Sequence, residues 1–341
     1  PYNFQFVIDS LSSKDTTQTN LDLHISSLVI RNGVLNYDVL YKPYERNGFS
    51  PSHMSFTNIS SHIIIYSLTN DALRASINNL AFKEKSGINV RKLSLNTDVT
   101  KHNIAINDLL LQMAHSNIAV PKLSATFSRN DKGEINYNSL QFNGYVNAQK
   151  VSPLDLQPFI KHDISTLPDV NLIAKADGTT RKTRGSVNLN TSDKGLSLKT
   201  SFTLQNIIND SLKGAFSNAV YDMEEMRLQV NHSMIAKLAS ITDLPEVLQN
   251  IGDVDVKGRA KGVRDDFNYA FDVTTSNTGD IDCNGRYANN TLELNAKAKQ
   301  LSINKLIGYD EIGTLNAEAT VKTDFATTDL DCDITDLVYK G

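Results

Sequence analysis

The stretch Leu292-Glu293-Leu294-Asn295-Ala296-Lys297-Ala298 alternates strictly between apolar side chains and polar or charged ones. Successive side chains of a β-strand point to opposite faces of the sheet, so this segment would have one apolar face and one polar face. In a helix the same charges would be scattered around the axis. The stretch therefore predicts a strand.

The same two-residue period recurs along much of the chain, for example in residues 196–204, 267–273 and 315–321. Turn signals lie between such runs, among them Asn32-Gly33, Asn47-Gly48, Ser86-Gly87, Asn143-Gly144, Asp193-Lys194-Gly195 and Asn284-Gly285. Asn and Gly tolerate the positive φ that tight hairpin turns need, so we expect antiparallel neighbours joined locally. On this pattern we expect about twenty strands, with an irregular loop over residues 38–53.

Three short helices are predicted, over residues 151–156, 232–238 and 301–306, and an alternating strand follows each one. We take Ser152, Ser233 and Ser302 as their capping residues. The spacing between these serines is not constant, which argues against a propeller and suits an open array of strands. We divide the chain into a β-rich part without such helices, residues 1–150, and a part with the repeated helix and strands, residues 151–341.

Composition excludes several classes of function. The 341 residues have 34 Lys and Arg against 38 Asp and Glu, a net charge of -4, so we expect no nucleic-acid partner. No apolar run approaches the roughly 18 residues of a membrane span. The sequence begins at Pro1 and has no signal peptide, and we therefore expect it to be a piece of a longer chain.

No pattern of catalytic, metal-ligating or cofactor-binding residues is present, and we expect a protein that is not an enzyme and has no cofactor. The two cysteines, Cys283 and Cys332, fall in alternating segments and are predicted on the buried face of strands. The seven histidines are scattered and are interpreted as surface or loop residues: His24, His53, His62, His102, His115, His162 and His232.

Two acidic pairs, Glu224-Glu225 and Asp265-Asp266, are interpreted as solvated turns rather than paired catalytic carboxylates. The alternating Asp329, Asp331 and Asp333 lack the Gly and Glu of a calcium loop, and they fit the outer face of a strand.

The segment Leu23-His24-Ile25-Ser26-Ser27-Leu28-Val29-Ile30-Arg31-Asn32-Gly33-Val34-Leu35-Asn36-Tyr37, together with the repeated short helix, linker and strand, resembles the AsmA-like superfamily. Within it, the chain is most similar to TamB-type translocation and assembly module proteins of Bacteroidota. The opening residues 3–11 resemble the segment that precedes the first such unit. The resemblance covers essentially the whole chain and rests on patterns, not on catalytic signatures.

This resemblance implies an all-β fold: an elongated antiparallel sheet, curled along its axis into an apolar groove of the β-taco type, with a few short helices. It implies a periplasmic protein of a Gram-negative bacterium, anchored to the inner membrane by a segment outside this sequence. The implied function is the movement of phospholipids between the inner and outer membranes. The alternative that it implies is outer-membrane protein translocation or assembly, with an outer-membrane barrel partner of the BamA/TamA type.

The alternating residues fit lipid chemistry in their own right. An acyl chain of sixteen carbons in water is unfavourable by roughly 12 kcal/mol, at about 0.8 kcal/mol per methylene, and an apolar trough would remove most of this. We expect the acyl chains of phospholipids to contact a groove lining made of Phe202, Leu204, Phe267, Phe271, Leu292, Leu294, Leu315 and Val321.

Three other readings stay open from the sequence. The alternating strands could be the two layers of a closed β-sandwich. A sheet edge could pair with strands of nascent outer-membrane proteins. An extended β-scaffold could be an adhesin or bind glycans, which would require a ladder of surface aromatics.

Overall fold

The computed structural model describes residues 22–43, 48–208, 215–242, 244 and 246–339, so residues 3–11 and Asn47 of the predictions above lie outside the described residues. The fold is all-β. Its strands are β1 (Asp22–Asp38), β2 (His53–Thr69), β3 (Ala72–Glu84), β4 (Asn89–Thr100), β5 (Asn103–Met113), β6 (Asn117–Arg129), β7 (Ile135–Val151), β8 (Val170–Thr179), β9 (Lys182–Thr191), β10 (Leu196–Gln205), β11 (Val220–Val230), β12 (Val254–Val263), β13 (Asp266–Thr275), β14 (Gly279–Ala288), β15 (Thr291–Ser302), β16 (Thr314–Thr323) and β17 (Thr328–Thr335).

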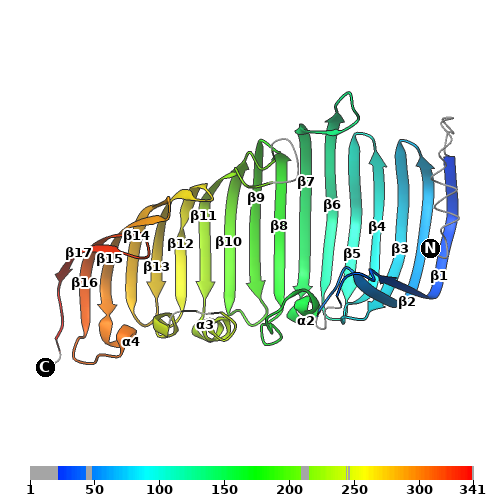
Figure 1. The fold of residues 1–341 in the computed structure, drawn as a ribbon. Helices are drawn as coiled ribbons and strands as arrows, with labels where there is room; N and C mark the ends of the chain where they lie inside the picture. The colour runs from blue at the N-terminus through cyan, green and yellow to red at the C-terminus, as the bar shows by residue number, and fades with distance from the viewer. Residues whose placement is uncertain (1–21, 44–47, 209–214, 243, 245, 340–341) are drawn as a thin grey trace.

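Each strand pairs antiparallel with the strands before and after it in the chain, from the β1–β2 pair to the β16–β17 pair. The described residues thus form one open sheet of 17 strands, laid out in chain order with β1 and β17 at its two ends (Figure 1). The expectation of an elongated, curled antiparallel sheet with a few short helices is confirmed. The closed sandwich is excluded for the described residues.

Three short α-helices lie along one edge of the sheet: α2 (Pro153–Leu156), α3 (His232–Ala239) and α4 (Ile303–Ile307) (Figure 1). They follow β7, β11 and β15, so four strands separate each of these helices from the next, and an even number of strands returns the chain to the same edge each time. We call this edge the helix edge and the opposite one the turn edge. The repeated helix and strand predicted from the sequence is therefore present, as a four-strand unit.

The predicted capping serines are only partly right. Asn231, not Ser233, is the N-cap of α3, and its side chain accepts a hydrogen bond from the Met234 backbone N–H at 2.8 Å. Ser152 and Ser302 occupy the N-cap positions of α2 and α4, but neither side chain makes a capping hydrogen bond. Asn ranks with Ser among preferred N-caps, so Asn231 can cap this helix two residues before the predicted Ser233.

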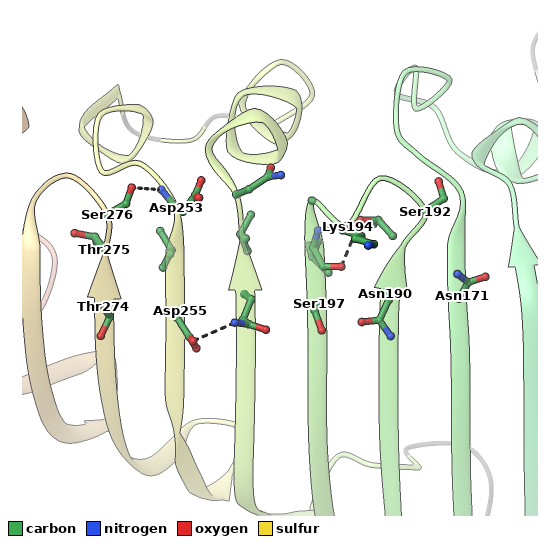
Figure 2. Close-up of a pocket in the computed structure, with 17 residues that line it drawn as sticks. Asn171, Asn190, Ser192, Lys194, Ser197, Asp253, Asp255, Thr274, Thr275 and Ser276 are labelled. Carbon is green, nitrogen blue, oxygen red and sulfur yellow. Dashed lines mark hydrogen bonds between the residues drawn. The ribbon is translucent and has the colours of Figure 1, made fainter.

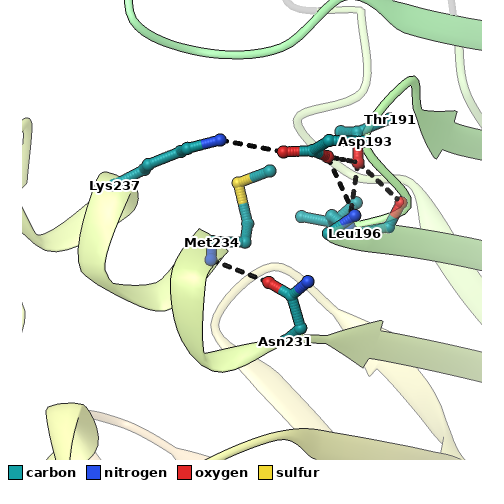
Figure 3. Close-up of polar contacts among 7 residues, drawn as sticks. Thr191, Asp193, Leu196, Asn231, Met234 and Lys237 are labelled. Atoms are coloured by element: carbon teal, nitrogen blue, oxygen red, sulfur yellow. Dashed lines mark hydrogen bonds and ion pairs between the residues drawn. The ribbon is translucent and has the colours of Figure 1, made fainter.

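Each helix packs back against the preceding hairpin turn on the helix edge. In α2, the buried Asp155 accepts a hydrogen bond from the His115 backbone N–H at 2.9 Å, in the turn between β5 and β6. In α3, Lys237 pairs with Asp193 of the β9–β10 turn at 2.8 Å (Figure 3). Before α4, the Ser302 backbone N–H donates to the Thr278 carbonyl in the β13–β14 turn at 3.0 Å. The helices therefore fix neighbouring hairpins to one another at this edge.

At the helix edge, the loop between β1 and β2 also contacts the segment that follows β7. The 3₁₀-helix η1 (Gln157–Phe159) continues from α2, and the Pro158 carbonyl accepts a hydrogen bond from the Phe49 backbone N–H at 2.7 Å. The rings of Phe49 and Phe159 lie 5.4 Å apart. The loop between β1 and β2, which the sequence predicted to be irregular, thus contacts the segment that follows β7.

Three predicted turns are wrong, because Asn32-Gly33, Asn143-Gly144 and Asn284-Gly285 lie inside β1, β7 and β14. Asn32 has a φ of 54° at an irregular pairing of β1 with β2, so its signal reflects a bulge. Gly144 and Gly285 lie opposite in-register neighbours, where a bulky side chain from the next strand occupies the space above the glycine. This is why the strand count is 17 among the described residues and not about twenty.

Candidate functional site

The register between strands separates the sheet into two faces of opposite chemistry. Residues that pair across neighbouring strands point to the same face. Phe271 of β13 pairs with Gly258 of β12 and Cys283 of β14, while the next residue, Asp272, pairs with Lys257 and Asp282. We call the face that contains Phe271 the apolar face and the face that contains Asp272 the polar face.

On the apolar face, four rows of residues follow the strand register from β7 to β17, with one irregularity between Phe202 of β10 and Met223 of β11. The two aliphatic rows lie nearer the helix edge and consist of Ala148, Leu172, Leu189, Leu198, Leu228, Val256, Val273, Ile281, Ala298, Ala317 and Ile334, and of Val146, Ala174, Val187, Thr200, Met226, Gly258, Phe271, Cys283, Ala296, Ala319 and Cys332. The third row consists of Gly144, Ala176, Gly185, Phe202, Met223, Ala260, Tyr269, Gly285, Leu294, Val321 and Leu330. The fourth, which we call the hydroxyl row, lies nearest the turn edge and consists of Phe142, Gly178, Thr183, Leu204, Tyr221, Gly262, Phe267, Tyr287, Leu292, Thr323 and Thr328. No charged side chain occurs in any of these rows.

All eight residues predicted to line the groove lie on the apolar face, from β10 to β16. Seven of them are half-buried, as expected for a single-layer sheet whose side chains shield one another. Leu315 is the exception: it is only 7% exposed and pairs with Leu301 beside α4. Leu315 is therefore a packed residue of the helix edge rather than part of an open surface.

No second layer covers the apolar face in the part of the chain that the structure describes. The contacts between strands are made with the neighbours in the sheet, and the helices contact the helix edge. The largest side chains with less than 2% exposure among the described residues are Met234, His53 and Thr180, all at the ends of strands or at the helix edge. An ordinary sandwich of this size would bury many large apolar residues between its sheets.

Aromatic rings fill the space above several glycines of the apolar face. The ring of Phe202 lies over Gly185 and that of Phe271 over Gly258, while the Cβ of Phe267 lies over Gly262. Phe267 also contacts Tyr221 and Tyr287, with ring centroids 6.2 and 5.4 Å apart. The glycines thus leave room for large side chains on the neighbouring strands.

Two tyrosines of this surface direct their hydroxyl groups toward the turn edge. Tyr221 donates a hydrogen bond to the Val263 carbonyl at 3.0 Å, at the end of β12. Tyr287 donates to Asn290 in the β14–β15 turn at 3.1 Å. Burial raises the pKa of Tyr221, and burial likewise raises the pKa of the Cys283 thiol. Both groups are therefore neutral at physiological pH.

The polar face holds charged side chains that pair across strands. Arg227 contacts Asp255 at 2.6 Å, Arg286 contacts Asp266 at 2.7 Å, and Lys297 contacts Glu318 at 2.9 Å. Exposed pairs of this kind contribute little to stability, because water and salt screen them. Asp266 of the second acidic pair is therefore a partner in an ion pair. Asp329, Asp331 and Asp333 pair with Lys322, Thr320 and Glu318 of β16 and lie on the same polar face, as predicted.

Two hollows open on the polar face of the sheet. One, of about 760 Å³, is lined by polar side chains on successive strands near the helix edge, including Asn171, Asn190, Ser197, Asp255 and Thr274 (Figure 2). The other, of about 890 Å³, lies among Lys199, Arg227, Lys257 and their neighbours. None of the eight predicted lining residues contributes to either hollow. Neither hollow has an aromatic side chain in its lining, so neither offers the stacking platform that the glycan-binding reading required.

The remaining sequence predictions are placed as follows. Cys283 is half-buried, but Cys332 is exposed because β17 is an edge strand, so its predicted burial is wrong. His53 is also not a surface residue: it is 1% exposed at the start of β2, within 3.3 Å of Asp38 and 3.0 Å of the Lys42 carbonyl. Glu224-Glu225 lies at an irregularity within β11 rather than in a turn.

Among the described residues, no group of His, Cys, Asp and Glu is arranged to hold a metal ion. Within the same ranges, no helix is long and apolar enough to cross a membrane. No protein-family model, no curated protein and no solved structure matches the chain.

Proposed function

We propose that this protein is a non-enzymatic lipid carrier whose apolar face holds the acyl chains of phospholipids. The single observation that carries the proposal is the continuous apolar face of the sheet, which no other part of the described chain covers. A water-exposed surface of this kind is unfavourable by about 25 cal/mol per Å². A soluble protein rarely exposes one without an interaction partner.

The chemistry of the face favours acyl chains over a protein as the occupant. Protein interfaces carry about one hydrogen bond per 100–200 Å² and rely on a few anchoring residues that fill pockets. The aliphatic rows offer no charge and only one hydroxyl, that of Thr200. An acyl chain needs no hydrogen bond, and a uniform surface holds it without fixing it at one place.

The resemblance noted in the sequence supports a cellular setting for this function. We propose a periplasmic protein of a Gram-negative bacterium that moves phospholipids between the inner and outer membranes. Its anchor would lie in the inner membrane, and its protein partner would be an outer-membrane barrel of the BamA/TamA type. The uncovered apolar face supports this proposal, because lipid in transit through water needs such a surface.

The test is purification of the chain from bacteria without detergent, followed by native mass spectrometry and lipid extraction. We expect phospholipid to copurify with the unaltered chain. Leu294→Asp, in the third row of the apolar face, should abolish retention. Ile173→Asp is the matched control, because Ile173 lies on the polar face, pairs with Asn147 and Asn188, and is 41% exposed.

Circular dichroism must show that both variants keep their sheet structure. Retention of lipid by Leu294→Asp, or equal loss in both variants, would contradict the proposal. A lipid-free but folded unaltered chain that also fails to transfer a fluorescent phospholipid between vesicles would reject it outright.

A scaffold for outer-membrane protein strands is a second candidate, favoured by β17. Every residue of this strand is exposed, and it pairs only with β16 among the described residues. A free strand edge can accept a further strand by backbone hydrogen bonding. Asp331→Pro in β17 should then abolish capture of an isolated barrel strand peptide while lipid retention stays unchanged. Loss of lipid retention with unchanged peptide capture would favour the lipid carrier.

A further inference from the structure

The apolar face is least polar in its two aliphatic rows and becomes more polar from there to the turn edge. Of the two aliphatic rows, the one that contains Val256 and Ala298 has no polar side chain, and the other has only Thr200. The strand ends on the helix side of these rows add two hydroxyls, those of Thr191 and Thr275, and the third row adds that of Tyr269. The hydroxyl row has five: Thr183, Tyr221, Tyr287, Thr323 and Thr328. A phospholipid has the same gradient, from acyl chains to glycerol and headgroup.

From this gradient we infer that a bound phospholipid lies with its acyl chains along the two aliphatic rows, across the strands, and with its headgroup at the turn edge beside the hydroxyl row. This inference rests on the proposed lipid function and adds the direction of the ligand, its polar end and the residues on each side of it.

The direction across the strands follows from side-chain size. In β14, β15 and β16 the aliphatic rows contain only Cys283, Ala296, Ala319 and their neighbours Ile281, Ala298 and Ala317. Larger side chains flank this lane of small residues, Leu294 and Val321 toward the turn edge and Leu315 toward the helix edge. An acyl chain laid along a strand would instead have to pass over the larger side chains of the third and fourth rows.

The length of the aliphatic rows also fits this direction. With strands about 4.8 Å apart, the ten spacings from β7 to β17 give roughly 48 Å. One leaflet of a bilayer is about 15 Å of hydrocarbon, half of the usual 30 Å. An acyl chain in the rows would therefore cover about three to four strands, and the rows would continue beyond it without a polar barrier.

The polar end follows from what closes each edge. At the helix edge Met234, Ile235 and Leu315 are buried, and the hydroxyls of Thr191 and Thr275 bond within their own hairpin turns. At the turn edge the hydroxyls of Tyr221 and Tyr287 bond to the ends of strands and to turn residues. Tyrosine is enriched where a protein passes from an apolar to a wet environment, which is the position of a lipid headgroup.

The chain contains two reporters of its own for this arrangement. Cys283 and Cys332 lie in the same aliphatic row, on β14 and β17, and both are free thiols. A lipid in the lane should shield both from alkylation by N-ethylmaleimide. Ala270→Cys provides the control thiol, because Ala270 pairs with Asn284 on the polar face of β13.

The experiment loads the full chain from phosphatidylcholine vesicles, removes the vesicles, and follows alkylation of each thiol by mass spectrometry. Each rate is normalised to the lipid-free rate of the same thiol, because burial already raises the pKa of Cys283 and slows it. We expect several-fold protection of Cys283 and Cys332 and none at position 270. Ala296→Phe, which fills the lane between the two cysteines, should remove the protection, and Ala270→Phe should not.

The polar end is tested with two photoreactive phosphatidylcholines, one with a diazirine at the acyl terminus and one with a diazirine in the headgroup. We expect the acyl probe to label the aliphatic rows of β14–β16 and the headgroup probe to label the β14–β15 turn. Headgroup labelling of α3 or α4 would overturn the inference. So would unprotected cysteines in a chain that retains lipid, which would leave the proposed function intact, whereas absence of bound lipid would reject the proposed function itself.

Discussion

The ring of Phe202 on β10 lies across Gly185 on β9, so closely that a Cβ on Gly185 would overlap the ring and come within 2.7 Å of the Lys175 carbonyl oxygen. The two residues face each other in register on the apolar face. Gly144, in the same row, has more room: a Cβ there would lie 3.3 Å from one methyl carbon of Leu123. The two glycines thus lie in the same row but differ in the space that an added Cβ would have.

Gly185→Ala should therefore destabilise the protein by about 1–3 kcal/mol, since the added methyl group must displace a ring and press on fixed backbone. Gly144→Ala should be neutral or slightly stabilising, because the flexible Leu123 side chain can move and alanine restricts the unfolded chain. Urea unfolding followed by circular dichroism measures both. Equal midpoints for the two variants would contradict the packing described here.

Leu315→Asp and Leu294→Asp should differ in the same assay. Leu315 is 7% exposed, so a carboxylate there would be buried without a partner, and we expect a loss of several kcal/mol. Leu294 is half-buried on the open face, where a carboxylate can reach water, so the fold should survive. Similar destabilisation of both variants would indicate that the region around Leu294 is covered by a second layer.

The ion pair between Asp193 and Lys237 should make stability depend on pH in the acid range. The hydrogen bond from Lys237, helped by the Gly195 backbone N–H and Thr191, lowers the pKa of Asp193 to about 2 (Figure 3). An unfolded Asp titrates near 3.9, so this contribution is complete above about pH 5 and is lost as the pH falls toward 2. Both side chains are about a third exposed, and we therefore expect at most about 1 kcal/mol.

Asp193→Asn measures this contribution. The difference in unfolding free energy between the unaltered chain and the variant should shrink as the pH is lowered from about 5 to 2. In a Lys237→Met background the same difference should be smaller at every pH. A difference that grows on acidification would have the wrong sign and would contradict the assignment.

Lipid retention should be insensitive to salt. The rows of the apolar face carry no charge, and the charged groups pair with one another on the other face. Raising the salt to about 1 M shortens the Debye length to roughly 3 Å and weakens surface ion pairs but not apolar burial. Lipid extraction at low and high salt checks this. Release of lipid at high salt would indicate that charged residues hold the headgroup.

The strands could be predicted from the sequence because each of them has a two-residue period, and the faces follow from the same period. The period could not distinguish one uncovered sheet from two packed sheets, because a strand in either has one apolar face. That question is decided by contacts between distant segments. The sequence also did not distinguish Gly285, which makes room for Tyr269 on the next strand, from a turn glycine, since both roles favour the same residue.

The site was predicted in its composition but not in its details. All eight lining residues lie on one face because they follow the period, yet Leu315 is closed off by the helix edge, where the sequence showed only another alternating leucine. His53 is buried because the irregular loop before β2 folds against it, with the Lys42 carbonyl within hydrogen-bonding distance. Contacts of this kind depend on where a loop ends, and local periodicity carries no information about that.

Each strand that the structure describes pairs only with its neighbours in the sequence, and this affects the order in which the sheet can form. In every hairpin of the sheet the partner of a strand is the segment synthesised just before it. The strand-to-strand contacts of the described residues are thus made between neighbours in the sequence. In other all-β proteins, strands far apart in the sequence often pair, and such long-range pairing usually makes folding slow. A sheet of this topology can grow one strand at a time in the order of synthesis, and each new strand covers the edge that the previous one had left open.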